Sequence, residues 1–146
     1  MDGPEDLETF GQLIGFVLRL ETQLAEFYEK MAHREDLNAE QKNTLLVLHE
    51  DYSKRAKIME RIKRENVNEM ILERIQEVRS FEYYEQLETD GLIKAVSARL
   101  QTLEEQMENF YLDSAIKGKK VLAEVSRRLQ KMADGNREHI VMLKKL

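Results

Sequence analysis

The chain has 146 residues, enough for one domain with a hydrophobic core and too few for two domains of ordinary size. Charged residues make up 35%, hydrophobic residues 42%, and there is one proline and no tryptophan, a composition typical of long helices. The net charge of −5 argues against a surface that follows phosphate backbones, so we expect no nucleic-acid partner. The absence of cysteine excludes thiol catalysis, disulfides and thiolate metal sites, and leaves carboxylates and imidazoles as the metal ligands available.

Nothing in the sequence indicates a membrane or a secretory route. No apolar run approaches the roughly 20 residues of a membrane span, and the acidic start MDGPEDLE is unlike a signal peptide. We therefore expect a cytoplasmic protein without a membrane partner.

A first helix is predicted from the Gly3-Pro4 turn to about Arg34. Its apolar stripe contains one carboxylate, Glu21. Because an isolated carboxylate in an apolar seam costs several kcal/mol, this glutamate must be paired, protonated or bound to a metal ion. The other residues of the stripe are Ile14, Val17, Leu24, Tyr28 and Met31.

A second helix is predicted to begin at a capping box, in which Asn38 is the N-cap and Gln41 stands three residues on, and to end near Lys63. Its apolar stripe also carries Tyr52 and Arg55. The long connection that follows, residues 64–89, predicts a short helix in NEMILERIQEV and then an aromatic segment, SFEYYEQL, that covers an end or a side of the helices. A connection of this length lets the third helix start at the same end as the second.

The third helix is predicted to start at Thr89 or Asp90 and to end at Lys117, before Gly118. A fourth helix follows and runs to the end of the chain. Two polar residues, Asn136 and His139, interrupt its apolar stripe. Gly135 weakens this helix beside them and indicates a bend.

An internal repeat links the first and third helices. The segment ETQLAEFY, from Glu21 to Tyr28, returns 83 residues later as EEQMENFY, from Glu104 to Tyr111. Each copy places a glutamate and a tyrosine two turns apart on one side of a helix. Two helices therefore each carry one inward carboxylate and one inward phenol.

Four long helices, a long central connection and two inward glutamates resemble the rubrerythrin branch of the ferritin-like superfamily, and the likeness covers most of residues 8–146. The resemblance implies a single all-α domain over residues 1–146. It would be a ferritin-like four-helix bundle with a long crossover between helices 2 and 3 and a short extra helix in that crossover. In such bundles a glutamate from each of two helices and a Glu-x-x-His pair from each of the other two hold two iron or manganese ions.

The chain departs from this ligand pattern on its second and fourth helices. The positions equivalent to Glu-x-x-His read Tyr52-x-x-Arg55 and Asn136-x-x-His139. Arginine stays protonated and offers only donors, so Arg55 cannot bind a metal ion and would repel one. The resemblance leaves three family ligands: Glu21, Glu104 and His139.

Without metal, the former ligand positions are expected to form a closed polar network. Arg55 would bridge both glutamates with paired hydrogen bonds, and His139 would add a second cation when protonated. Tyr52 and Asn136 would supply neutral hydrogen-bonding groups, while Tyr28 and Tyr111 are expected as core aromatics whose hydroxyls find partners there. A mononuclear iron or manganese site of Glu21, Glu104 and His139, with or without His49, is the alternative; we expect no cofactor.

The sequence leaves three functions open. The leading hypothesis is a metal-free or metal-poor relative of the rubrerythrin-like proteins in a structural or interaction role. The second is a diiron- or manganese-family oxidoreductase that acts on peroxide or oxygen with a nonstandard site, so whether the chain is an enzyme stays undecided. The third is a plain helical dimerisation protein. A homodimer is expected because Phe16, Leu18 and Leu20 lie off the stripe of the first helix and need cover, from the connection or from a second subunit.

Overall fold

The computed structural model describes residues 5–66, 72–118 and 123–146, and most of these residues are helical. The all-α expectation is confirmed at this level, since four helices account for most of the described chain. A small two-stranded sheet was not predicted. The helices are α1 (Phe10–Ala32), α2 (Ala39–Asn66), α3 (Ile93–Lys117) and α4 (Ala123–Leu143), and the shorter elements are β1 (Asp6–Thr9), β2 (Arg74–Arg79) and the 3₁₀ turn η1 (Tyr84–Gln86).

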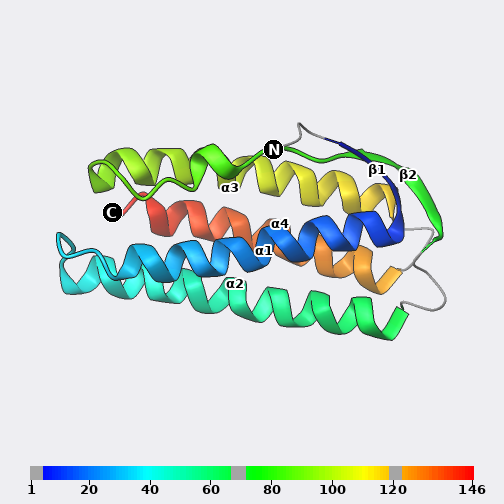
Figure 1. The fold of residues 1–146 in the computed structure, drawn as a ribbon, viewed down its shortest axis with the longest axis horizontal. Coiled ribbons are helices and arrows are strands. Elements are labelled where there is room, and N and C mark those ends of the chain that lie inside the picture. The colour runs from blue at the N-terminus through cyan, green and yellow to red at the C-terminus, as the bar shows by residue number, and fades with distance from the viewer. Residues whose placement is uncertain (1–4, 67–71, 119–122) are drawn as a thin grey trace.

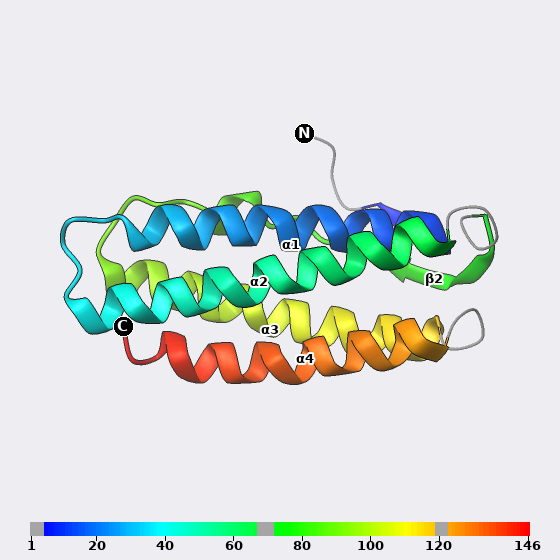
Figure 2. The same ribbon diagram turned by 90° about the horizontal axis from the view of Figure 1, so that it is seen from below.

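The four helices lie side by side (Figure 1). Helix α1 packs along α2, and α3 packs along α4. Within each pair the helices run in opposite directions, whereas α2 and α3 run in the same direction (Figure 2). The connection between α2 and α3 achieves this by returning along the length of the molecule from the end where β2 lies.

The two strands correct the predictions for the start of α1 and for part of this connection. Helix α1 begins at Phe10 and not after Pro4, because residues 6–9 pair with β2 in an antiparallel ladder that sets Leu7 opposite Val78. The short helix predicted over residues 68–78 is wrong from Arg74 onward, where the chain is a strand. Burial of both Leu7 and Val78 explains the preference for the extended pairing. Residues 68–71 lie outside the described part of the chain.

The helix ends were predicted with mixed success. The capping box of α2 is confirmed, because Asn38 and Gln41 exchange side-chain to backbone hydrogen bonds of 2.8 and 3.0 Å. Helix α3 ends at Lys117 before Gly118, as predicted, but it begins at Ile93 and not at Thr89 or Asp90. Gly91 has a φ of 107°, which a right-handed helix does not allow. Helix α4 ends at Leu143, before the end of the chain, and residues 119–122 lie outside the description.

The connection covers the apolar surface of α1 that seemed to need a partner. Phe16 packs against Phe81 and Tyr83, with ring centroids 5.6 and 6.2 Å apart. Of the two sources of cover that the sequence left open, the chain itself supplies it, since Phe16 and Leu20 are buried and Leu18 is half-buried. Their cover comes from the same chain, so the observation behind the homodimer no longer points to a second subunit; the homodimer stays a prediction.

None of the helices, as far as the described residues extend, combines the length and the apolar character needed to cross a membrane.

Candidate functional site

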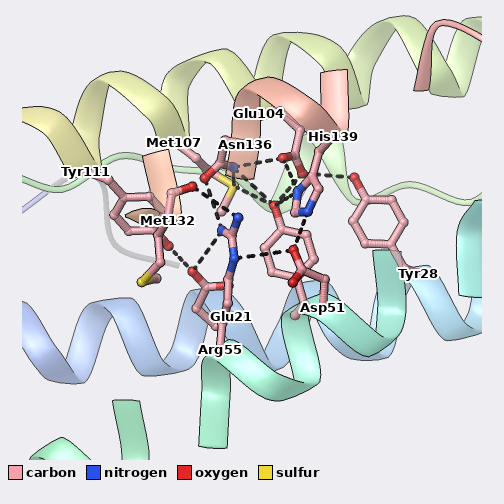
Figure 3. A network of polar contacts seen from close by, with 11 residues as sticks. Glu21, Tyr28, Asp51, Arg55, Glu104, Met107, Tyr111, Met132, Asn136 and His139 are labelled. Carbon is pink, nitrogen blue, oxygen red and sulfur yellow. Dashed lines mark hydrogen bonds and ion pairs between the residues drawn. The ribbon is translucent and has the colours of Figure 1, made fainter. Parts of the chain in front are cut away.

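All four helices contribute to one polar network (Figure 3). It contains every residue that the sequence singled out at the family ligand positions and both tyrosines of the repeat. Each of these residues is at most 6% exposed. The members are Glu21 and Tyr28 on α1, Tyr52 and Arg55 on α2, Glu104 and Tyr111 on α3, and Asn136 and His139 on α4.

The internal repeat is joined crosswise between α1 and α3. Tyr28 donates to Glu104 Oε2 over 3.1 Å, and Tyr111 donates to Glu21 Oε1. Each tyrosine therefore serves the glutamate of the other copy. Burial raises the pKa of both phenols well above the ordinary value, and the nearby carboxylates add to this, so both hydroxyls remain donors.

Glu104 is surrounded by donors. Besides the bond from Tyr28, it accepts from Tyr52 over 2.5 Å, from the side-chain amide of Asn136 over 2.8 Å and from His139 Nδ1 over 2.8 Å. Four donors from three helices thus satisfy both of its oxygens. The imidazolium of His139, with Nδ1 2.8 Å from Oε1, is the cation paired with this buried carboxylate.

Glu21 has fewer partners. Tyr111 donates to Oε1, and the Arg55 guanidinium lies 3.6 Å from the same oxygen, while Oε2 has no hydrogen-bond partner among the described residues. Burial is the largest influence and raises the pKa of Glu21 to about 7, although Arg55 and Tyr111 both oppose the rise. This carboxyl group therefore exchanges its proton near neutral pH.

Arg55 does not bridge the two glutamates, and this corrects the prediction. Its guanidinium forms an ion pair with Glu21, while its hydrogen bonds go across to α4, to Asn136 Oδ1 and to the Met132 carbonyl, each over 3.1 Å. It also lies 4.9 Å from the centre of the Tyr52 ring. Arg55 does not reach Glu104 because Asn136 and His139 already donate to that carboxylate.

Gly135 makes room for this arginine. A Cβ atom at this position would lie 2.5 Å from Arg55 Nη2, closer than real contacts allow. The glycine in the middle of α4 is therefore explained by the guanidinium packed against it. The sequence indicated a special backbone position there and predicted a bend, but it could not identify the neighbour.

Asp51 completes the network and was missed by the sequence analysis. His139 donates through Nε2 to Asp51 Oδ2 over 2.5 Å, and this carboxylate also lies 3.7 Å from Arg55 Nε. Burial lowers the pKa of His139, but the charge of Glu104 and the hydrogen bonds to Asp51 and Glu104 outweigh it and raise this pKa to about 9. The hydrogen bond from His139 in turn lowers the pKa of Asp51. The available signal was the spacing of Asp51 and Arg55, four residues apart on one helix.

The donor set does not fit a metal ion as it is arranged. Within the described ranges, no group of three or more His, Cys, Asp or Glu side chains is placed to hold one. At neutral pH both nitrogens of His139 carry protons that point at carboxylates, so neither offers a lone pair. His49 lies elsewhere, with its Nδ1 hydrogen-bonded to the Ala25 carbonyl over 2.7 Å. The arrangement instead joins three carboxylates, a guanidinium and an imidazolium by ion pairs and hydrogen bonds.

The chain matches no protein-family model, no curated protein and no solved structure. The site must therefore be interpreted from its own chemistry.

Proposed function

We propose that this protein is a rubrerythrin-like member of the ferritin-like fold whose metal seam has become an ion-pair network, and that it serves a structural or interaction role without a resident metal. The observation that carries the proposal is the position of Arg55. Its guanidinium is buried at a position where the resemblance requires a ligand, and it lies 3.6 Å from Glu21.

The charges in the seam support a metal-free state. Two cations, Arg55 and protonated His139, face three carboxylates, Glu21, Glu104 and Asp51, and Glu21 has a pKa of about 7. The network is therefore close to neutral when Glu21 holds a proton. A divalent ion would add two positive charges beside a fixed guanidinium, which opposes binding.

One observation favours the alternative, a diiron- or manganese-family oxidoreductase acting on peroxide or oxygen. Oε2 of Glu21 is buried and has no partner among the described residues, as a ligand oxygen kept for an ion would be. This is one oxygen where an oxidoreductase site needs several ligands and open positions for its substrate.

Metal content decides between the two functions. Protein purified without chelator should contain near-zero iron and manganese by inductively coupled plasma mass spectrometry, and adding either ion anaerobically should leave its melting temperature unchanged. About two ions per chain, the number held by the related bundles, would overturn the proposal.

A gain-of-binding variant provides the matched comparison. Tyr52→Glu, Arg55→His and Asn136→Glu together restore the side chains that the resemblance places at these positions. We expect this triple variant to take up iron or manganese and to melt at a higher temperature with the metal than without it. Circular dichroism first establishes that it is folded; uptake by the parent chain equal to that of the variant contradicts the proposal.

A further inference from the structure

A surface pocket between α2 and α4 lies over the solvent side of Arg55. Its volume is about 260 Å³, and its lining includes both Arg55 and Gly135. Three further cations surround it, namely Lys54 on α2 and Arg128 and Lys131 on α4. The pocket is therefore a concentration of positive charge on a chain whose net charge is −5.

The cations at the rim of this pocket are not neutralised by nearby acids. Lys54, Arg128 and Lys131 have no ion pair within 4.0 Å among the described residues. Two carboxylates, Asp51 and Glu138, also line the pocket. Asp51 is paired with His139 and Arg55, and Arg55 is also paired with Glu21. Three rim cations without an ion pair in the described chain therefore face one carboxylate, Glu138.

Arg55 contributes donors to the inner wall of the pocket. A guanidinium has five N–H donors, and the two hydrogen bonds of Arg55 go to Asn136 and Met132. The guanidinium lies in the space that a side chain at Gly135 would take, and both residues line the pocket. A buried arginine thus lies behind the three cationic side chains of the pocket rim.

We propose that this pocket binds a phosphate group, either inorganic phosphate or the phosphate of a small monoester. A tetrahedral dianion can accept from the fork of a guanidinium and from several ammonium groups at once, which a single carboxylate does less completely. The volume exceeds that of a phosphate group and leaves space for a small organic substituent. Phosphate binding at this pocket does not depend on the metal content of the seam. The phosphate site and the proposed metal-free function can therefore fail separately.

Isothermal titration at constant ionic strength tests the proposal with two probes, inorganic phosphate and glycerol 2-phosphate, against chloride as the background anion. We expect saturable binding of at least one probe, and the tighter of the two identifies free phosphate or the ester as the source. The double variant Arg128→Gln with Lys131→Gln should weaken binding by about tenfold, equivalent to 1.4 kcal/mol. Both residues lie on the pocket rim and outside the buried network, so the variant should fold.

Lys57→Gln with Arg127→Gln is the matched control. Both residues are exposed, they lie on the same two helices and outside the pocket, and the change in net charge is equal. The control should bind as the parent does. Loss of affinity equal to that of the rim variant would show only general charge attraction and would overturn the proposal, as would the absence of saturable binding of either probe.

Discussion

Raising the pH should destabilise this protein, because the fold depends on protonated His139. Its pKa is raised from 6.5 to about 9, above all by the charge of Glu104 and the hydrogen bond to Asp51, while Arg55 and burial oppose the rise. A raised pKa means that the folded chain binds the proton more tightly than the unfolded chain does. The resulting stability is complete below pH 6.5 and is lost as the pH rises through 9.

The size of this effect follows from the pKa difference. Each pKa unit corresponds to 1.36 kcal/mol, so the imidazolium accounts for about 3 kcal/mol of the free energy of unfolding. Because small domains have a total stability of about 5–15 kcal/mol, the loss should be easily measured. Glu21 acts in a lower window, since its pKa is raised from 4.5 to about 7 and stability is lost as the pH rises between these values.

Urea unfolding followed by circular dichroism, at pH 5, 7 and 9 and constant ionic strength, checks this prediction. Above pH 7, the fall in the free energy of unfolding should come from the deprotonation of His139. The variant His139→Gln should therefore lose little stability between pH 7 and 9. The variant His33→Gln, at an exposed position, should decline as the parent does. Equal stability of the parent at pH 7 and 9, or an unchanged decline in His139→Gln, would refute the reasoning.

Three substitutions test other parts of the network by the same unfolding measurement. Arg55→Met should lower the free energy of unfolding by about 3–5 kcal/mol at pH 9, because it leaves the Glu21 carboxylate without its cation. The loss should be smaller at pH 5, where Glu21 takes up a proton. Equal stability of parent and variant at pH 9 would contradict the ion pair. Gly135→Ala should destabilise the fold, because the new methyl group displaces the Arg55 guanidinium. The helix propensity of alanine, which exceeds that of glycine by about 1 kcal/mol in a helix interior, opposes this loss. A net gain in stability would show that Arg55 can move aside without cost. Tyr111→Phe should cost about 1.5–3 kcal/mol, because it removes the one hydrogen bond that the buried Glu21 carboxyl group receives from the described residues. This cost should exceed that of Tyr28→Phe, and the reverse order would be inconsistent with the observed partners.

Helical periodicity explains why the members of the network could be predicted. The spacing of Glu21 and Tyr28, repeated in Glu104 and Tyr111, fixes which residues face inward whatever the neighbouring helices do. The same reasoning placed Arg55 in the seam, where the structure has it. The membership of these residues therefore follows from local geometry, whereas that of Asp51 was missed.

The pairing of charges could not be predicted in this way. It depends on how far each side chain reaches across the seam, and the prediction that Arg55 serves both glutamates ignored the competition from Asn136 and His139 for Glu104. Strand β2 was missed for a related reason. Its partner β1 lies more than 60 residues away in the sequence, and a short apolar segment has no periodicity that excludes a helix.

The repeat imposes a symmetry on the hydrogen bonds that the charges do not follow. Tyr28 and Tyr111 each donate to the glutamate of the other copy. Within the described part of the chain, however, Glu104 accepts four hydrogen bonds and Glu21 accepts one, with Arg55 at ion-pair distance. The difference comes from α2 and α4, which set an imidazolium beside one carboxylate and a guanidinium beside the other. A guanidinium keeps its charge at any pH that the fold survives, whereas an imidazolium does not. Loss of the His139 proton beside Glu104 therefore sets the pH above which the fold loses stability. The group that exchanges a proton near neutral pH is Glu21.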